Sequence, residues 1–443
     1  MTVTSTDRLT ADEILRLNRE YTFFSWSAQA KINPIVIDRA EGIYFWDPDG
    51  KRYIDFNSQL MSVNIGHGDK RVADAIGEQA HKLAFAAPQF ATEVRGRLGE
   101  LLAELTPGDL NTFFFTLGGA EANENALRMA RMYTGRQKVM ARYRSYHGAT
   151  AGAISVTGDP RRWASEPAVP GTVRVLDPYR YGNAEPDPVD EHLAYLDEVM
   201  QYEGPSTIAA FILETVTGTN GILIPPDGYL QGVRELCDRY GILLIADEVM
   251  AGFGRTGRWF AVDHWGVTPD LLTMAKGLTS SYLPLGAVAI SDKIAEHFAE
   301  RTYFGGLTYS AHPVSCAAAI AAVNVLKEDD LVGNAARLGP VMQQLHADLK
   351  AKHPSVGATR GIGLFGIVQL VRNRATNEPM APFNGSSPEM AALDARFKAD
   401  GLYTMQHWDS FFTNPPLCIT EDQLREAFAI VDGALEVTDA AVQ

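Results

Sequence analysis

Three apolar stretches of the sequence end in ionisable side chains. These ends are Glu214 after residues 208–213, Asp247 and Glu248 after residues 242–246, and Lys276 after residues 271–275. Short apolar runs are typical of parallel strands that helices cover on both faces. Because ligands bind outside the carboxyl ends of such strands, we expect these acids and this lysine to meet in one crevice. A single polar strand end indicates only a solvated loop, but three together favour a catalytic site.

A fourth apolar run, residues 112–116, leads into Gly118-Gly119-Ala120 and then into a helix that continues to about Tyr133. Small residues at the start of a helix let an anion approach the free N–H groups, and the helix dipole favours phosphate there. The stretch is neither a GxGxxG fingerprint nor a Walker A loop. We therefore predict a phosphate site for a ligand that is neither a dinucleotide nor a triphosphate.

A lysine, an aspartate and a phosphate site together are what pyridoxal phosphate (PLP) requires. The lysine forms a Schiff base with the aldehyde, and the carboxylate keeps the pyridine nitrogen protonated. Once substrate displaces it, the same lysine is a free amine that can move a proton. We therefore predict Lys276 and Asp247 as the catalytic residues and PLP as the cofactor.

The stretch LLIADEVMAGFGRTG, followed by PDLLTMAKGLTSSYLPLGAV, resembles the signature of the class III aminotransferases, the ω-aminotransferase group of the fold type I PLP enzymes. Further similarities extend over nearly the whole chain: GIYFWDPDGKRYIDF, LGGAEANENALRMAR, SYHG, GGLTYSAHP and NPPLCIT. The resemblance implies that Tyr146 stacks on one face of the cofactor ring and that Val249 presses on the other. It also implies that Thr308 reaches the phosphate of the neighbouring subunit's PLP, and hence a homodimer with shared active sites, alone or paired into a tetramer.

The positions at which we expect cofactor contacts come from these matching motifs. They are Gly118, Gly119, Ala120, Tyr146, His147, Glu214, Asp247, Val249, Lys276 and Thr308.

The chain departs from the family pattern at the substrate carboxylate. Many pyruvate-dependent members carry an arginine shortly before Pro-Pro-Leu, whereas GLYTMQHWDSFFTNPPLCIT contains none and has Met405 or His407 in its place. Bidentate capture by a guanidinium is therefore absent from this loop. The candidates to replace it are His407, Gln406 or an arginine from another loop, such as Arg255. Trp26 and Met61 are further candidates for substrate contacts, with core or interface positions as the alternative.

The predicted function is transfer of an amino group from an amine or ω-amino acid to a keto acid, with pyruvate as the expected acceptor, by ping-pong chemistry. An aminomutase or a decarboxylating transaminase on the same fold is the first alternative, and a non-catalytic PLP-binding relative is the second. A nicotinamide dehydrogenase is disfavoured because the strand-to-helix turn at the predicted phosphate site, Leu117-Gly118-Gly119-Ala120, is not a GxGxxG fingerprint.

These residues need a scaffold, and the apolar runs indicate one. From about residue 70 to 312, short apolar runs alternate with longer amphipathic stretches, which indicates βαβ units. The predicted class is α/β, and the resemblance implies the PLP-dependent transferase fold type I. It implies a large domain with a mostly parallel seven-stranded sheet covered by helices, and a small α+β domain from both termini. We expect residues 66–312 to form the large PLP-binding domain, and residues 1–65 and 313–443 to form the small one.

Composition excludes several classes of function. The net charge of −15 argues against nucleic-acid binding and against anionic membrane surfaces. Three widely spaced cysteines predict neither a disulfide framework nor a metal site. The polar N-terminus does not resemble a secretory signal, so we expect a cytoplasmic protein that binds small molecules.

Overall fold

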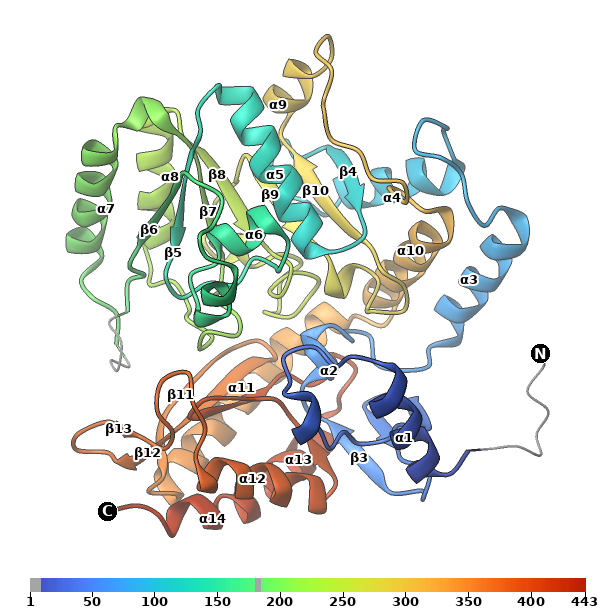
Figure 1. Ribbon diagram of the computed structural model, residues 1–443, viewed down its shortest axis with the longest axis vertical. Coiled ribbons are helices and arrows are strands. Elements are labelled where there is room, and N and C mark those ends of the chain that lie inside the picture. Colours follow the sequence, from blue (N-terminus) through green and yellow to red (C-terminus); the bar gives the residue numbers. More distant parts are fainter. Residues whose placement is uncertain (1–8, 180–184) are drawn as a thin grey trace.

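The computed structural model describes residues 9–179 and 185–443, which form two lobes (Figure 1). The upper lobe holds the largest sheet of the described chain, and the lower lobe combines the N-terminal segment, in blue, with the C-terminal segment, in orange and red. The predicted α/β class, with a small α+β part contributed by both termini, is confirmed. Residues 1–8 of the predicted N-terminal part lie outside the described range.

The sheet of the upper lobe has seven strands in the order β4-β10-β9-β8-β7-β5-β6. Only β10 runs against the others, so the sheet is mostly parallel, as predicted. The strands are β4 (Thr112–Thr116), β5 (Lys138–Arg142), β6 (Thr172–Val175), β7 (Ile208–Glu214), β8 (Leu243–Asp247), β9 (Leu271–Met274) and β10 (Gly286–Ile290). The apolar runs identified in the sequence coincide with β4, β7, β8 and β9 to within one residue at each end.

Helices cover both faces of this sheet because its strands are apolar on both. In β7, Ala210 and Ile212 pack with the α5 residues of one apolar cluster, while Phe211 and Leu213 pack with residues of α7 and α8 in another. This alternation follows from the two-residue period of a strand. The helices of this region are α3 (Lys70–Lys82), α4 (Glu93–Ala103), α5 (Gly119–Thr134), α6 (Ala151–Val156), α7 (Val189–Glu203), α8 (Tyr229–Tyr240) and α9 (Asp292–His297).

The lower lobe contains two smaller sheets. One has the order β1-β2-β3-β14, with β1 (Arg39–Glu41), β2 (Tyr44–Trp46), β3 (Arg52–Asp55) and β14 (Leu402–Tyr403). The other has the order β11-β12-β16-β15 with β13 beside β12; the bounds are β11 (Val356–Ile362), β12 (Phe365–Asn373), β13 (Glu378–Pro379), β15 (Gln406–His407) and β16 (Ser410–Thr413). Because β14 pairs in parallel with β3, the C-terminal segment completes a sheet that the N-terminal segment begins.

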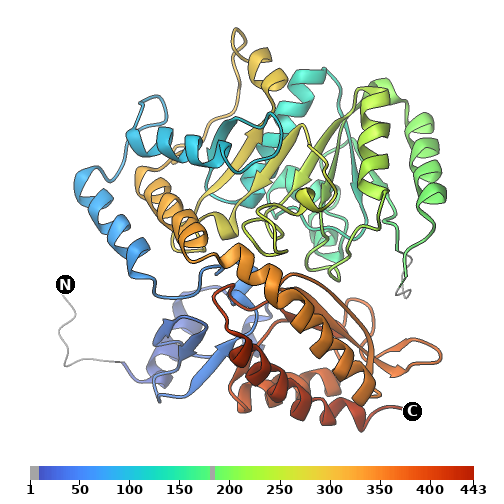
Figure 2. The same cartoon turned by 180° about the vertical axis from the view of Figure 1, so that it is seen from behind.

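Helices flank these sheets and link the lobes. They are α1 (Ala11–Tyr21), α2 (Ser58–Met61), α10 (Pro313–Glu328), α11 (Leu331–Lys352), α12 (Pro388–Ala399), α13 (Glu421–Ala434) and α14 (Glu436–Asp439). Helix α10 begins where we predicted the second domain boundary, yet it packs against α3 and α4 beside the large sheet (Figure 2). The division at residues 65 and 312 stays a prediction.

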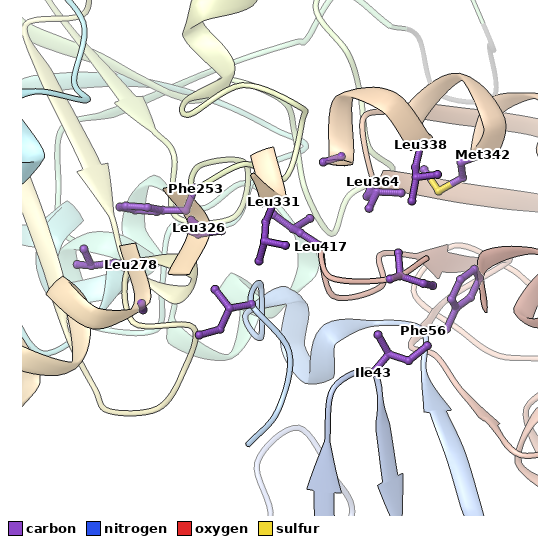
Figure 3. Close-up of a cluster of buried hydrophobic side chains, with 14 of the residues drawn as sticks. Ile43, Phe56, Phe253, Leu278, Leu326, Leu331, Leu338, Met342, Leu364 and Leu417 are labelled. Carbon is purple, nitrogen blue, oxygen red and sulfur yellow. The ribbon is translucent and has the colours of Figure 1, made fainter. Parts of the chain in front are cut away.

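One apolar cluster runs through both lobes (Figure 3). It joins Phe253 and Leu278, from loops after strands of the large sheet, to Leu331 of α11 and to Leu417 near the C-terminus. Burial of aliphatic and aromatic side chains stabilises such a contact by about 1.5–3 kcal/mol for each fully buried side chain. The lobes are therefore packed together next to the strand ends that carry the ionisable residues. Within residues 9–179 and 185–443, no helix is long and apolar enough to cross a membrane.

Candidate active site

The ionisable residues at the strand ends lie side by side. Glu214 and Asp247 are the last residues of β7 and β8 and are paired neighbours in the sheet. Asp247 is also paired with Thr273 of β9, and Lys276 follows two residues after that strand ends. Lys276 has a φ of 43°, in the left-handed region that non-glycine residues rarely adopt. Such backbone strain is typical of functional positions.

A cavity of about 510 Å³ opens at these strand ends, a volume typical of small-molecule sites. Nine of the ten predicted cofactor contacts line it: Gly118, Gly119, Ala120, Tyr146, His147, Glu214, Asp247, Val249 and Lys276. The fold thus brings together residues that are scattered over more than 150 positions of the sequence, because they follow different strands of one sheet.

Helix α5 begins at this cavity with Gly118 as its N-cap, so no N-cap side chain accepts from the first N–H groups of the helix. The first backbone N–H groups of a helix have no partner within it, so they are available to an anion. A Cβ atom on Gly119 would lie 2.8 Å from Cγ1 of Val249, closer than real contacts allow. Glycine is therefore required for the N-terminus of α5 to approach the loop after β8.

Hydrogen bonds from several sides hold Asp247, which is only 3% exposed. Its Oδ2 accepts from Asn123 Nδ2 at 2.8 Å and lies 2.7 Å from His147 Nδ1, while its Oδ1 accepts from the Val249 N–H at 3.0 Å. The bond to a carboxylate places a proton on Nδ1 of His147. Nε2 of the same ring is buried without a partner among the described residues, so Nδ1 is the ring nitrogen that donates to Asp247.

Glu214 anchors two loops of the cavity wall. Its carboxylate oxygens accept from the N–H groups of Tyr146 at 2.9 Å and Gly218 at 2.8 Å. Burial raises the pKa of Glu214 above its usual range, and the nearby Asp247 acts in the same direction. Glu214 thus fixes the loop that carries Tyr146 relative to the strand ends.

Burial also changes the chemistry of Lys276. It lowers the pKa of the amine to about 8, while Glu214 and Asp247 oppose that shift. At neutral pH a larger fraction of this amine is unprotonated than in a free lysine. The unprotonated form is the one that attacks a carbonyl group.

Arg161 is a cation beside the cavity that sequence analysis did not single out. Its guanidinium lies 3.7 Å from the centre of the Tyr146 ring, and Nη2 donates to Thr219 Oγ1 at 2.8 Å. Tyr146 and Thr219 both line the cavity. Asp159 pairs with Nε and Nη2 of the guanidinium, whereas Nη1 has no hydrogen-bond partner in the described part of the chain.

Four predicted contacts lie outside the lining of this cavity. Trp26 is 66% exposed, and Thr308 is exposed as well. Met61 is buried in an apolar cluster. Its sequence neighbours Leu60 and Ser62, which were not predicted, line the cavity. His407 lines a second, smaller cavity of about 110 Å³.

His407 and Arg255, which the sequence suggested for binding the substrate carboxylate, are both buried in surroundings that do not suit this role. Burial lowers the pKa of His407 to about 4, so the ring is uncharged at neutral pH and stacks on Trp408. Arg255 is fully buried, and Nη1 donates to the carbonyl groups of Leu364 and Pro415. Arg255 therefore ties the loop after β8 to the lower lobe and is closed to a substrate.

The residues that sequence analysis missed share one property: their place at the site depends on the tertiary fold. Asn123 and Thr273 are buried in a helix and a strand, where a polar side chain has no motif of its own. Arg161 lies in a short 3₁₀ helix, Pro160–Ser165, whose place over Tyr146 depends on the tertiary fold. The sole sequence signal was a polar residue, Asn123, on the buried side of an amphipathic helix.

The donor set fits PLP. A lysine amine, a buried carboxylate and free helix N–H groups face one cavity, and an aromatic ring stands at its wall. Within residues 9–179 and 185–443, no group of three or more His, Cys, Asp or Glu is arranged to hold a metal ion. Fold and site therefore define a PLP enzyme of the α/β type.

Comparison with known proteins gives the family. The model of the class III aminotransferases matches residues 26–435, and the chain belongs to this family. The putrescine–pyruvate aminotransferase of Pseudomonas aeruginosa is 35% identical over 92% of this chain and 91% of its own length. The predicted family, its enzyme class and its cofactor PLP are confirmed.

Solved structures agree with this assignment. A taurine:2-oxoglutarate aminotransferase from Bifidobacterium kashiwanohense, in complex with PLP and glutamate, superposes with a TM-score of 0.95 at 42% identity, covering 98% of this chain and 99% of that one. An (S)-enantioselective ω-transaminase from Thermomicrobium roseum gives a TM-score of 0.91 at 38% identity, with 97% and 99% covered.

Proposed function

We propose that this aminotransferase moves an amino group from an ω-amino acid or amine to a keto acid, with Lys276 as the group that anchors the cofactor and moves the proton. The observation that carries the proposal is the shared cavity of Lys276, Asp247 and the N-terminus of α5. PLP, when bound, supplies the aldehyde and the electron-accepting ring. Asp247 would pair with the ring nitrogen, the N–H groups of Gly119 and Ala120 would hold the phosphate, and Tyr146 and Val249 would enclose the ring.

We propose a ping-pong order because the donor and the keto acid must both react at the single cavity that contains Lys276. We propose that the donor's keto product leaves before the keto acid enters. Parallel lines in double-reciprocal plots of initial rate would support this order, and intersecting lines would contradict it.

Arg161 favours a donor or acceptor that carries an anionic group. Its Nη1 is free among the described residues, and it lies beside Tyr146 and Thr219 in the cavity wall. We propose that Arg161 binds this anion, in place of the arginine that is missing before Pro415. The relatives differ in acceptor, since pyruvate and 2-oxoglutarate each appear in their names. We propose pyruvate as the acceptor because a small keto acid fits a site without the usual arginine.

We propose that the active unit is a homodimer, alone or paired into a tetramer. Thr308 is exposed and outside the cavity of its own subunit, as expected for a residue that reaches a neighbour's phosphate. Exposed aromatic residues lie close to it in sequence, with Phe304 77% exposed and Tyr309 54% exposed and in ring contact with Phe85. Large exposed apolar groups of this kind are typical of interaction surfaces.

We also propose a cytoplasmic location. Cys237, Cys316 and Cys418 are all unpaired, which fits a reducing compartment. Fractionation of cells with an antibody to the protein would check it, and recovery outside the cytoplasmic fraction would contradict it.

The function is tested by a panel of amines and ω-amino acids, each assayed with pyruvate and with 2-oxoglutarate. We expect formation of alanine with at least one donor in the wild type and none in Lys276→Ala, which should stay folded. Sodium borohydride should attach the cofactor to the peptide that contains Lys276. Turnover without any keto acid would instead indicate an aminomutase, and release of carbon dioxide a decarboxylating transaminase. Attachment to another lysine would refute the role of Lys276.

A further inference from the structure

A chain of hydrogen bonds joins Asp247 to Asn123 and Thr273, which are distant from it in the sequence. Asn123, in the first turns of α5, donates from Nδ2 to Asp247 Oδ2 at 2.8 Å and to the carbonyl of His147 at 2.7 Å. Its Oδ1 accepts from Thr273 Oγ1 at 2.7 Å. Asn123 is 1% exposed and Thr273 is fully buried, so these bonds form away from bulk water.

The sheet register explains why Thr273 can take part. Thr273 of β9 is the paired neighbour of Asp247 of β8, so both side chains stand on the same face of the sheet. Helix α5 covers that face and places Asn123 between them. Three elements, α5, β8 and β9, thus meet through one amide group.

The amide of Asn123 has one chemically correct orientation here. Asp247 and the His147 carbonyl are both acceptors and need the NH₂ end, while the Thr273 hydroxyl can donate to the oxygen end. If the Thr273 hydroxyl were absent, the amide oxygen would be buried without a donor, and turning the amide would place oxygen against oxygen at Asp247. The hydroxyl of Thr273 therefore selects the orientation in which Asn123 supports a carboxylate.

We infer that Asn123 and Thr273 are positioning residues, which hold the Asp247 carboxylate aimed at the cofactor ring nitrogen. The inference rests on the proposed function, because it assigns Asp247 to that nitrogen. Thr273 lies outside the lining of the cavity, and Asn123 lines it with an amide that is already bonded to Asp247, His147 and Thr273. Their effect passes through Asp247: a carboxylate that loses a buried donor becomes less stable as an anion and freer to turn.

Asn125 supplies a matched control on the same helix. It is 3% exposed, donates from Nδ2 to the Glu121 carbonyl at 2.8 Å, and accepts from Tyr303 at 2.6 Å. It is therefore a buried, fully bonded asparagine two residues away that does not contact Asp247. Asn125→Leu should reproduce the general cost of such a loss without affecting the carboxylate.

The test compares Asn123→Leu, Asn125→Leu, Thr273→Val and Thr273→Ser in the full chain. Affinity for PLP is measured by titrating the cofactor-free protein and following protein fluorescence, and steady-state kinetics give kcat and KM for the donor. In Asn123→Leu we expect PLP affinity and kcat each to fall about ten- to a hundredfold, the range typical when a partner behind a ligating group is removed. The donor KM should change by less than about threefold, since no substrate contact is lost.

Thr273→Val should shift both quantities in the same direction, and Thr273→Ser should restore them because it keeps the hydroxyl. Asn125→Leu should keep both within about twofold of the wild type, whatever its melting temperature. Equal effects of Asn123→Leu and Asn125→Leu, or a Thr273→Val variant like the wild type, would overturn the inference. If Asn123→Leu does not fold, the two variants at Thr273 decide by themselves. An inactive wild type would refute the proposed function instead.

Discussion

At the scale of single residues, the surroundings of Asp247 make an amide there a poor substitute. The amide of an Asp247→Asn variant would direct its NH₂ group either at the Val249 N–H or at the donors from Asn123 and His147. It also cannot hold a ring nitrogen protonated. We expect Asp247→Asn to bind PLP and to lose kcat/KM by several orders of magnitude. The kinetics of the PLP-saturated variant check this, and retention of activity within about tenfold, or about 1.4 kcal/mol, would mean that another acid has this role.

Arg161 gives a second prediction at this scale, about substrate class. Arg161→Gln should lower kcat/KM for 4-aminobutanoate about ten- to a hundredfold, because a charge-assisted hydrogen bond contributes about 1.5–3 kcal/mol. The uncharged donor butylamine is the matched control, since it has no anion to bind. Equal losses for both donors would show that Arg161 supports Tyr146, above whose ring it lies, and does not select the anion.

At the level of secondary structure, the position of the first turn of α5 depends on the absence of a side chain at Gly119. Gly119→Ala would place a methyl group 2.8–2.9 Å from the two Cγ atoms of Val249, so either Val249 or the helix end must move. We expect PLP affinity to fall by at least about tenfold, because a small displacement of the phosphate donors is costly at such a site. Gly77→Ala in α3, where a new methyl group meets nothing within 4 Å, is the control and should bind PLP like the wild type. Normal affinity in Gly119→Ala would place the phosphate elsewhere.

The elements that sequence patterns predicted are those whose own residues carry the signal. The apolar runs of β7, β8 and β9 lead to Glu214, Asp247 and Lys276, and these three residues line the cavity. Strand β10, Gly286–Ile290, is as apolar as these strands, but its sequence does not indicate that it runs antiparallel to its neighbours. The pairing of β14 with β3 is likewise a long-range contact that two residues cannot encode. His407 illustrates the same limit, since its burial, and hence its lowered pKa, depends on Trp408 and other residues packed around it.

At the scale of the whole molecule, buried histidines link stability to pH. Burial lowers the pKa of His346, on α11, from 6.5 to about 3, and the ring lies against Phe428 with Nε2 2.9 Å from Thr413 Oγ1. Between these values the unfolded chain binds the proton and the native protein does not. The stability that the neutral ring contributes is therefore present above pH 6.5 and is lost as the pH falls.

From pH 7 to pH 5, this histidine should reduce the free energy of unfolding by about 2 kcal/mol. We expect His346→Gln to lose about that much less than the wild type over the same interval, as measured by urea unfolding at both pH values. His81→Gln, at an exposed position, is the control and should follow the wild type. Identical losses in all three proteins would contradict the role of His346.

The proposed sharing of active sites makes a prediction that only a mixed assembly can test. If Thr308 serves the neighbouring subunit, a dimer of one Lys276→Ala chain and one Thr308→Val chain contains one fully intact site, with Lys276 from the second chain and Thr308 from the first. Its other site carries both changes and is inactive. Random exchange of the two variants should leave about a quarter of all sites intact.

The mixture should therefore gain activity over either parent when PLP is kept low enough to leave the Thr308→Val protein mostly without cofactor. The two variants are unfolded and refolded together to exchange subunits, and activity is followed at that PLP concentration. The same variants refolded apart and then combined are the control, because they hold no mixed dimers. If Thr308 acts within its own chain, every site with an intact Lys276 still carries the Thr308→Val change, and co-refolding brings no gain. Light scattering must also give a mass of at least two chains of 48.4 kDa, and a monomer would refute shared sites outright.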